Sequence, residues 1–180
     1  MDEQRSQVRQ ASAAALLAAS SRPAQADVMA PGNPGDFDFL TGEWRIAHRR
    51  LRAPGDWDAF EGEATCWGIL GGICSVEELR IPARNFSGMG LRLLNLQTRV
   101  WSDHWVNAAS GALGASRQTG GFVNGVGAFG ADEMDGDALI KVRGIWDNIS
   151  PTTTRWRQAV SRDNGASWEE NWIMDWRRAG

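Results

Sequence analysis

An all-β domain, built as an up-and-down antiparallel β-barrel of about ten strands, is the fold that the sequence predicts. Runs of alternating polar and apolar residues repeat along most of the chain, and few stretches show helical periodicity. Short turn sequences rich in Gly, Pro, Asn and Asp separate these runs. A meander of this length normally closes, because closure removes the unpaired edges of its outer strands. A two-sheet sandwich is the alternative, although its Greek-key connections usually need longer loops.

The strongest local signal is the hairpin over residues 155–178. Asn164-Gly165 separates two alternating runs, and both central residues of a type I′ turn need the positive φ that Asn and Gly tolerate. In the second arm the large apolar residues fall at even spacings, which predicts that they share one face of a strand. These residues are Trp168, Trp172, Met174 and Trp176. A face this rich in Trp needs a deep apolar interior, which we interpret as the lumen of a barrel.

The remaining strands follow from the same alternation between turn sequences. The expected strands are 42–52, 57–67, 73–81, 86–96, 99–108, 113–122, 126–131, 138–148, 154–162 and 167–177. The turns between them are expected at 53–56, 68–72, 80–85, 97–98, 110–111, 124–125, 135–136, 148–153 and 164–165. Ten strands are enough to enclose a ligand cavity, because about eight already hold one small ligand.

Residues 1–35 are expected to form an N-terminal extension, and residues 36–180 the barrel. The first 30 residues are rich in Ala, Ser and Gln, and a Pro- and Gly-rich linker follows at residues 31–35. We favour a helix lying beside the barrel and a cytoplasmic protein. A vestigial or uncleaved export signal is the alternative, because Ala24-Gln25-Ala26 resembles a signal-peptidase site.

The composition of the chain limits the classes of partner that we expect it to bind. The formal net charge is −3 and Lys141 is the only Lys, so the chain has no broad basic surface for nucleic acid. It also has no apolar run of about 18 residues, so we expect no membrane-spanning helix and no membrane partner. The composition is compatible with a homodimer. A tight turn centred at Leu70 would place Cys66 opposite Cys74 at a Cβ distance slightly too long for a disulfide, so we expect two reduced thiols.

Several motifs resemble a known family. The segment from Phe37 to Trp44 resembles the opening of a calycin barrel, where a Gly-x-Trp on the first strand plugs the closed end. Further matching motifs are His48-Arg49-Arg50-Leu51, Phe60-x-Gly62, Leu91-Arg92-Leu93, Trp101-Ser102 with Trp105, Gly136 with Val142-Arg143, Trp146, Arg155-Trp156-x-Gln158-Ala159, Ser161, and Trp168-Glu169-x-Asn171-Trp172-Ile173-Met174. Together, residues 36–178 resemble the uncharacterised bacterial lipocalin-like proteins of the domain of unknown function 1579 type. The resemblance implies a lipocalin-like fold and no particular activity. The chain departs from the family at Asp103-His104, where relatives carry an aromatic residue before Trp105.

Period-two alternation predicts which side chains face the lumen. On the first strand Trp44, Ile46 and His48 lie opposite the arginines, so His48 is expected inside. Gln158 is expected inside by the same argument. The weight of Trp in strand 99–108 favours Trp101, Asp103, Trp105 and Asn107 inside and His104 outside. Strand 138–148, with Arg143, is ambiguous, and either Glu77 or Glu78 could face inwards.

His48 and Arg143 are the candidates for chemistry, together with a carboxylate partner of His48. His48 could act as a general acid or base, with Asp103 or Glu77 as its partner. The alternative is a hydrogen-bonded core histidine. Arg143 could clamp a carboxylate or polarise a carbonyl, or it could form a salt bridge outside the barrel. No metal is expected, because two His cannot form a three-His zinc site and the carboxylates lack ligand spacing.

These patterns favour a binding protein that holds a small apolar or aromatic molecule in a Trp-rich hydrophobic pocket. The expected ligand-binding residues are Trp44, Trp101, Trp105, Asn107, Gln158, Trp172 and Met174. The first alternative is a cofactor-free cyclase, isomerase or hydro-lyase of secondary metabolism, with His48, Asp103 and Arg143 as catalytic residues. The second is a haem-binding barrel, which would need an inward His as the axial ligand, whereas His104 is expected to face outwards. The favoured reading needs no cofactor.

Overall fold

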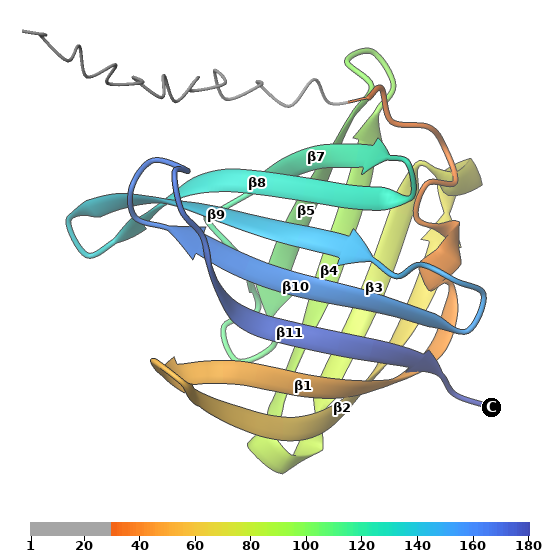
Figure 1. The fold of residues 1–180 in the computed structure, drawn as a ribbon. Coiled ribbons are helices and arrows are strands. Elements are labelled where there is room, and N and C mark those ends of the chain that lie inside the picture. Colours follow the sequence, from red (N-terminus) through yellow and green to blue (C-terminus); the bar gives the residue numbers. More distant parts are fainter. Residues whose placement is uncertain (1–29) are drawn as a thin grey trace, which may run out of the picture.

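A computed structural model describes residues 30–180 and confirms the predicted closed antiparallel barrel of ten strands (Figure 1). The strand order is β4-β3-β2-β1-β11-β10-β9-β8-β7-β5, and pairing between β4 and β5 closes the ring. Every neighbouring pair is antiparallel, and the short β6 adds to one end of β5. The helix expected beside the barrel falls on residues 1–29, outside the described residues.

The bounds of the elements are close to the expected ones. The strands are β1 (Gly42–Ala53), β2 (Asp56–Ile69), β3 (Cys74–Ile81), β4 (Phe86–Asn95), β5 (Val100–Asn107), β6 (Ala112–Leu113), β7 (Gln118–Val123), β8 (Val126–Asp135), β9 (Ala138–Asp147), β10 (Thr153–Ser161) and β11 (Glu169–Arg178). Three short 3₁₀ turns accompany them: η1 (Asp38–Leu40), η2 (Leu70–Gly72) and η3 (Pro82–Arg84).

One expected strand, 113–122, is divided in the structure. The backbone N–H of Gly114 donates to the carbonyl oxygen of Trp105 at 2.7 Å, and the chain then leaves the ladder until β7 begins at Gln118. As a result β5 and β7 pair over only three residue pairs, from Trp101 to Asp103 on β5. The barrel wall is therefore weakly paired beside the second half of β5.

The hairpin between β10 and β11 has the predicted turn, with positive φ at Asn164 and Gly165. The prediction for Trp168 was wrong. Gln158 pairs with Trp172 and Ala159 pairs with Glu170, so Asn171 is an extra residue in β11. Such a bulge reverses the alternation, because the side-chain period of a strand is two. Trp168 therefore lies outside the barrel, where its ring centre is 4.0 Å from the guanidinium carbon of Arg143.

The two cysteines are free and buried, but they do not face each other. Cys66 pairs with Glu77 and Cys74 pairs with Ile69, because the connection between β2 and β3 is centred nearer to Gly71 than to Leu70. Burial raises the pKa of the Cys66 thiol far above its usual range, so the thiol stays protonated.

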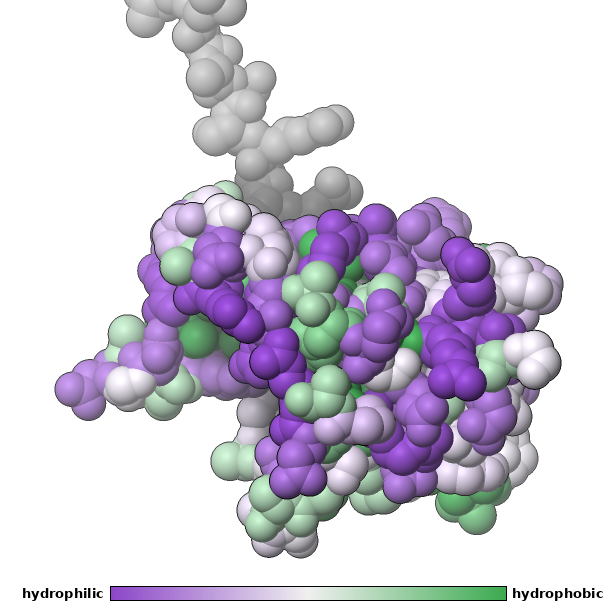
Figure 2. Space-filling model, turned by 90° about the horizontal axis from the view of Figure 1, so that it is seen from below, coloured by the Kyte–Doolittle hydropathy of each residue, from purple (hydrophilic) through white to green (hydrophobic). Residues whose placement is uncertain are grey.

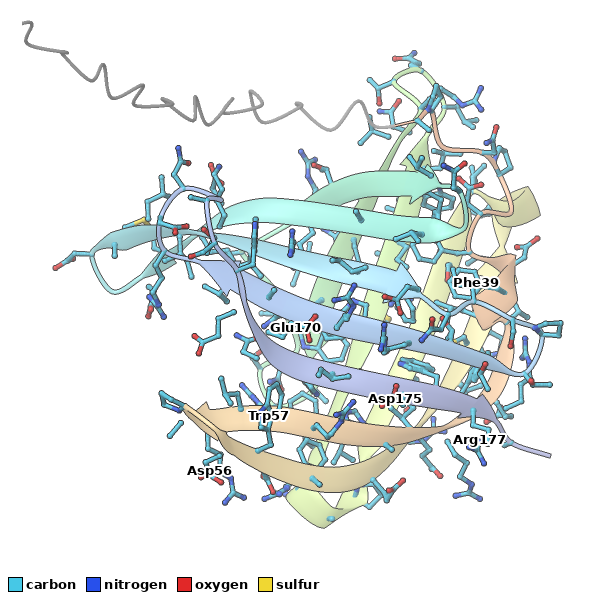
Figure 3. The ribbon with its side chains drawn as sticks, in the orientation of Figure 1. Phe39, Asp56, Trp57, Glu170, Asp175 and Arg177 are labelled. Atoms are coloured by element: carbon cyan, nitrogen blue, oxygen red, sulfur yellow. The ribbon has the colours of Figure 1, made fainter. Side chains whose placement is uncertain are left out.

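The segment before β1 closes one end of the barrel. The indole N–H of Trp44 donates to the carbonyl oxygen of Leu40 at 2.6 Å, and the indole N–H of Trp101 donates to Asp36 at 3.0 Å. The ring of Phe37 lies edge-on to Trp101 with centroids 5.0 Å apart. Phe39 lies at this end, and Trp57 at the opposite end of the β1–β2 hairpin (Figure 3). This end is therefore filled with side chains.

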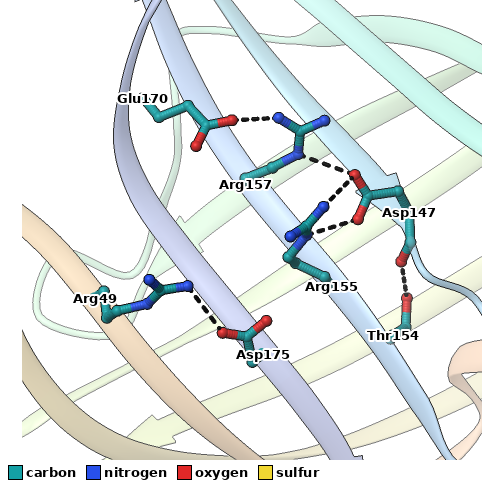
Figure 4. A network of polar contacts seen from close by, with 7 residues as sticks. All are labelled: Arg49, Asp147, Thr154, Arg155, Arg157, Glu170 and Asp175. Carbon is teal, nitrogen blue, oxygen red and sulfur yellow. Dashed lines mark hydrogen bonds and ion pairs between the residues drawn. The ribbon is translucent and has the colours of Figure 1, made fainter.

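Ion pairs cover the outer face of neighbouring strands (Figure 4). Asp147 accepts hydrogen bonds from both Arg155 and Arg157 at 2.8–3.0 Å, and Arg157 also pairs with Glu170. Partial burial alone would raise the pKa of Asp147, but the two guanidinium groups hold it below its usual range. Seen from below, the surface is mostly hydrophilic, with hydrophobic residues gathered near its middle (Figure 2). The charged outer face fixes which side of each strand points into the barrel.

Glycines on several strands leave room for their neighbours. A Cβ atom on Gly88 would lie 2.2 Å from the indole of Trp105, and one on Gly144 would lie 2.9 Å from Nε1 of Trp156. A Cβ atom on Gly120 would lie 2.0 Å from the backbone oxygen of Ala128. Residues at these positions therefore have to be small for the barrel to keep its shape.

We expect Gly120→Ala to destabilise the barrel by about 1–3 kcal/mol, because the contact is with backbone atoms that cannot move aside. Gly130→Ala is the matched control, since its Cβ would lie 3.5 Å from the nearest atom and should change stability by no more than about 0.5 kcal/mol. Urea unfolding of the two variants measures this difference. Equal unfolding midpoints would contradict the packing described for β7 and β8.

Candidate functional site

The barrel encloses a cavity of about 350 Å³. It reaches the surface between β6 and β7, because the exposed residues Gly114 and Ala115 belong to its wall. This opening lies where β5 and β7 are weakly paired. Most of the wall is apolar, from Leu79, Phe86, Trp105, Trp146, Trp156, Trp172, Met174 and Trp176. The polar part includes Glu77, Arg92, Asp103, Gln118 and Gln158.

Register places the Trp residues of three neighbouring strands in contact. Trp146 of β9 pairs with Trp156 of β10, and Trp156 pairs with Met174 of β11. The ring centroids of Trp156 and Trp172 are 6.0 Å apart in an edge-to-face arrangement, and those of Trp146 and Trp176 are 5.5 Å apart. Such pairs hold large rigid rings in fixed orientations. They give the cavity a stiff aromatic wall.

The polar part of the cavity is built around Arg92, whose side chain is 5% exposed. Its Nη2 donates to Oε2 of Glu77 at 2.5 Å, and its Nε lies 3.5 Å from Oδ2 of Asp103. A Cβ atom on Gly90 would lie 3.2 Å from Nη2, so this glycine leaves space for the guanidinium group. The guanidinium carbon is 5.3 Å from the ring centre of Trp146. A charged group thus lies against the aromatic wall and between two carboxyl groups.

Burial sets the protonation of this cluster. It raises the pKa of Asp103 above its usual value, and the positive charge of Arg92 offsets only part of that effect. Burial alone would lower the pKa of Arg92. The negative charges of Asp103 and Glu77 outweigh that effect and raise the pKa, so the guanidinium keeps its charge. The cluster is neutral when Asp103 holds a proton and carries one negative charge when it does not.

Three N–H groups of the wall are buried and have no hydrogen-bond partner among residues 30–180. They are Nη1 of Arg92, Nε1 of Trp146 and Nε1 of Trp176. Nearly all buried polar groups in native proteins are paired with protein or with a bound molecule, because an unpaired one costs about 1–3 kcal/mol. These donors favour an occupant of the cavity, water or ligand, that presents acceptor atoms.

His48 points inwards, as expected, but it is not part of the cavity wall. Its ring is 1% exposed and stacks on Phe60 with centroids 4.8 Å apart. Its Nδ1 accepts a hydrogen bond from Nε1 of Trp172 at 3.2 Å. Burial lowers its pKa to about 4, so the ring is neutral and the proton sits on Nε2, which faces Gly62. His48 therefore orients Trp172 from behind the wall.

The structure brings five of the ten candidate residues together in the cavity wall: Asp103, Trp105, Gln158, Trp172 and Met174. Three of the remaining candidates are fixed elsewhere in the core or at a turn. Trp44 and Trp101 belong to the filled end, and Asn107 accepts a hydrogen bond from the backbone N–H of Ala109 at 2.9 Å. The cavity wall thus comes mainly from β3–β5 and from β9–β11, and β1, which carries Trp44, does not contribute to it.

The structure also places Arg143, whose orientation the sequence left ambiguous, and His104, which was expected to face outwards. Arg143 lies on the outer face of β9, since Val142, Gly144 and Trp146 are buried on the other face. His104 borders the opening, and its Nε2 lies 3.2 Å from the hydroxyl of Ser102 on the outer face of β5. Glu77 is the inward residue of the Glu77-Glu78 pair, with 3% of its surface exposed.

Sequence reasoning missed Arg92 as part of the site. The period-two pattern does place Arg92 on the same face as Gly88, Gly90 and Leu94. Two glycines beside an arginine on one face indicate that the arginine side chain needs the space that larger residues would fill. The signal was masked because Leu91 and Leu93, on the opposite face, make the other side of the strand look more apolar.

No protein-family model matches the chain, and no curated protein matches it. Within residues 30–180, no three His, Cys, Asp or Glu side chains are placed to hold a metal ion together. A membrane-spanning helix is likewise absent from the part of the chain that the structure describes. The fold and the cavity define a Trp-rich β-barrel with an internal pocket.

We expect His48 to make the stability of the protein depend on acidity. Its pKa is about 4 in the folded state and 6.5 in the unfolded state, so the unfolded state binds more protons between these values. Stability is fully present above pH 6.5 and is lost as the pH falls towards 4, by roughly 3 kcal/mol. His48→Gln keeps an acceptor for Trp172 and should remove this contribution. Unfolding free energies measured from pH 4 to 7 that show the same slope in both proteins would contradict it.

We expect Arg92→Met to cost about 3–5 kcal/mol, because it leaves Glu77 as an uncompensated buried charge. The double variant Glu77→Met with Arg92→Met should regain most of that loss, since apolar residues of similar volume often replace a buried ion pair without penalty. Urea unfolding at pH 7 compares the two. A double variant no more stable than the single one would show that Glu77 and Arg92 are not coupled as described.

Proposed function

We propose that this protein binds a small apolar or aromatic molecule inside the barrel. The observation that supports this proposal is the cavity of about 350 Å³ with a largely aromatic wall and an opening to the surface. Ligand cavities usually measure about 300–1,000 Å³ and combine apolar walls with a few convergent polar groups. Trp156, Trp172 and Trp105 offer flat surfaces for stacking, while Arg92 and Asp103 orient the ligand.

Enzymatic activity on the same scaffold is a second candidate, favoured by the raised pKa of Asp103. A protonated carboxyl group beside an arginine in an aromatic cavity could donate a proton to a bound substrate in a cyclisation or isomerisation. In this reading Asp103 takes the acid role first expected for His48, because the ring of His48 lies behind Trp172. The lipocalin-like family assignment is part of the same proposal and is supported by the barrel topology.

Binding of the neutral fluorescent probe N-phenyl-1-naphthylamine tests the proposal. We expect saturable binding of one probe per chain, with enhanced probe emission and quenching of Trp emission. Native mass spectrometry of the purified protein should also show whether a small molecule accompanies it. Binding without saturation, or with many probes per chain, would contradict a defined internal site.

The opening can be tested with a pair of variants. We expect Ala115→Phe to slow association of the probe several-fold, because Ala115 is exposed and belongs to the cavity wall. Ala112→Phe is the matched control, since Ala112 is exposed on β6 and lies outside the wall. Equal association rates in stopped-flow measurements would place the opening elsewhere.

A further inference from the structure

We propose that the ligand of this cavity is a neutral aromatic carbonyl compound whose oxygen accepts hydrogen bonds from Arg92 and from the indole N–H groups of Trp146 and Trp176. This inference rests on the proposed function, because it names the chemical class that the internal site selects. It follows from the balance of donors, acceptors and charges around the cavity.

The first step is the kind of atom that the cavity leaves unpaired. Three buried groups of the wall have no hydrogen-bond partner within the described residues, and all three are N–H groups: Nη1 of Arg92 and Nε1 of Trp146 and of Trp176. Trp172, by contrast, already donates to His48. A ligand that presents an acceptor oxygen satisfies these donors, whereas a hydrocarbon or an ammonium group leaves them unpaired.

The second step is that the side chains that carry these donors are neighbours. The guanidinium carbon of Arg92 lies 5.3 Å from the ring centre of Trp146, and the centroids of Trp146 and Trp176 are 5.5 Å apart. All three side chains belong to the wall of the same cavity. We therefore assign the polar group of the ligand to this cluster and its apolar part to the remaining aromatic rings.

The third step is the charge of the ligand. Glu77 already contacts Arg92 at 2.5 Å, and Asp103 lies 3.5 Å from it. The positive charge of Arg92 is thus matched before a ligand arrives, and an added carboxylate would lie beside the buried Glu77 and the partly buried Asp103. Like charges at such distances in a buried site repel strongly. An uncharged acceptor, the oxygen of a ketone, aldehyde, ester or quinone, uses the N–H groups without that repulsion.

Three probes of nearly equal shape test this assignment. They are 2-acetonaphthone, which has a neutral carbonyl; 2-isopropenylnaphthalene, which has a methylene group in place of the oxygen; and 2-naphthoate, which is anionic. Dissociation constants are measured at pH 7 by quenching of Trp emission. We expect the ketone to bind at least about tenfold more tightly than the hydrocarbon, the gain typical of a hydrogen bond to a charged donor. We also expect it to bind more tightly than naphthoate.

Variants connect this preference to the residues. In Glu77→Met with Arg92→Met, the ratio of hydrocarbon to ketone dissociation constants should fall towards one. Trp176→Phe removes one N–H group and keeps an aromatic ring, so the ratio should fall several-fold. Arg80→Met is the control, because Arg80 pairs with Glu63 and Glu78 on the outer face and should leave the ratio unchanged.

The outcomes separate the inference from the proposed function. Equal binding of ketone and hydrocarbon keeps the internal site and overturns the carbonyl assignment. Tighter binding of naphthoate also overturns it and identifies an anionic ligand. Failure of all three probes to bind saturably contradicts the proposed function itself. A preference for the ketone that survives in both cavity variants would remove Arg92 and Trp176 from the assignment.

Discussion

The buried charge of Arg92 is the constraint on which the rest of the cavity depends. A guanidinium group inside an aromatic lumen is tolerated only when carboxylates compensate it. The register supplies both partners: Arg92 on β4 pairs directly with Asp103 on β5, and Glu77 on β3 pairs with Gly90, two residues away on the same face of β4. A shift of one residue in either ladder would move these side chains to opposite faces. The ion cluster and the barrel register therefore fix each other.

The space around this cluster comes from glycines and from an unevenly filled barrel. Gly90 makes room for Arg92, and Gly144 makes room for Trp156. Phe37 and Trp44 help to fill one end, so the open volume lies in the rest of the lumen, between β3–β5 and β9–β11. Where β5 and β7 pair over only three residue pairs, the wall opens at Gly114 and Ala115. The barrel therefore has one end filled with side chains and an internal cavity that opens through its side.

Much of the fold was readable from the sequence because alternation and turn chemistry are local. The Asn164-Gly165 turn, the inward face of Trp44 and the closure were predicted correctly. Trp168 was placed on the wrong face because the bulge at Asn171 depends on pairing with β10. The site was harder, since it depends on register between strands. His48 points inwards but lies behind Trp172. Arg92 can be recognised as part of the site only when its contacts with Glu77 and Asp103 are known.

The most direct measurement is a high-resolution crystal structure of the purified protein, examined at the cavity. We expect acceptor atoms of a ligand or of ordered water within hydrogen-bond distance, about 3 Å, of Nη1 of Arg92 and the indole nitrogens of Trp146 and Trp176. A cavity collapsed by repacked indoles, or an Arg92 side chain turned away from Glu77, would contradict the description of a donor-lined internal binding site.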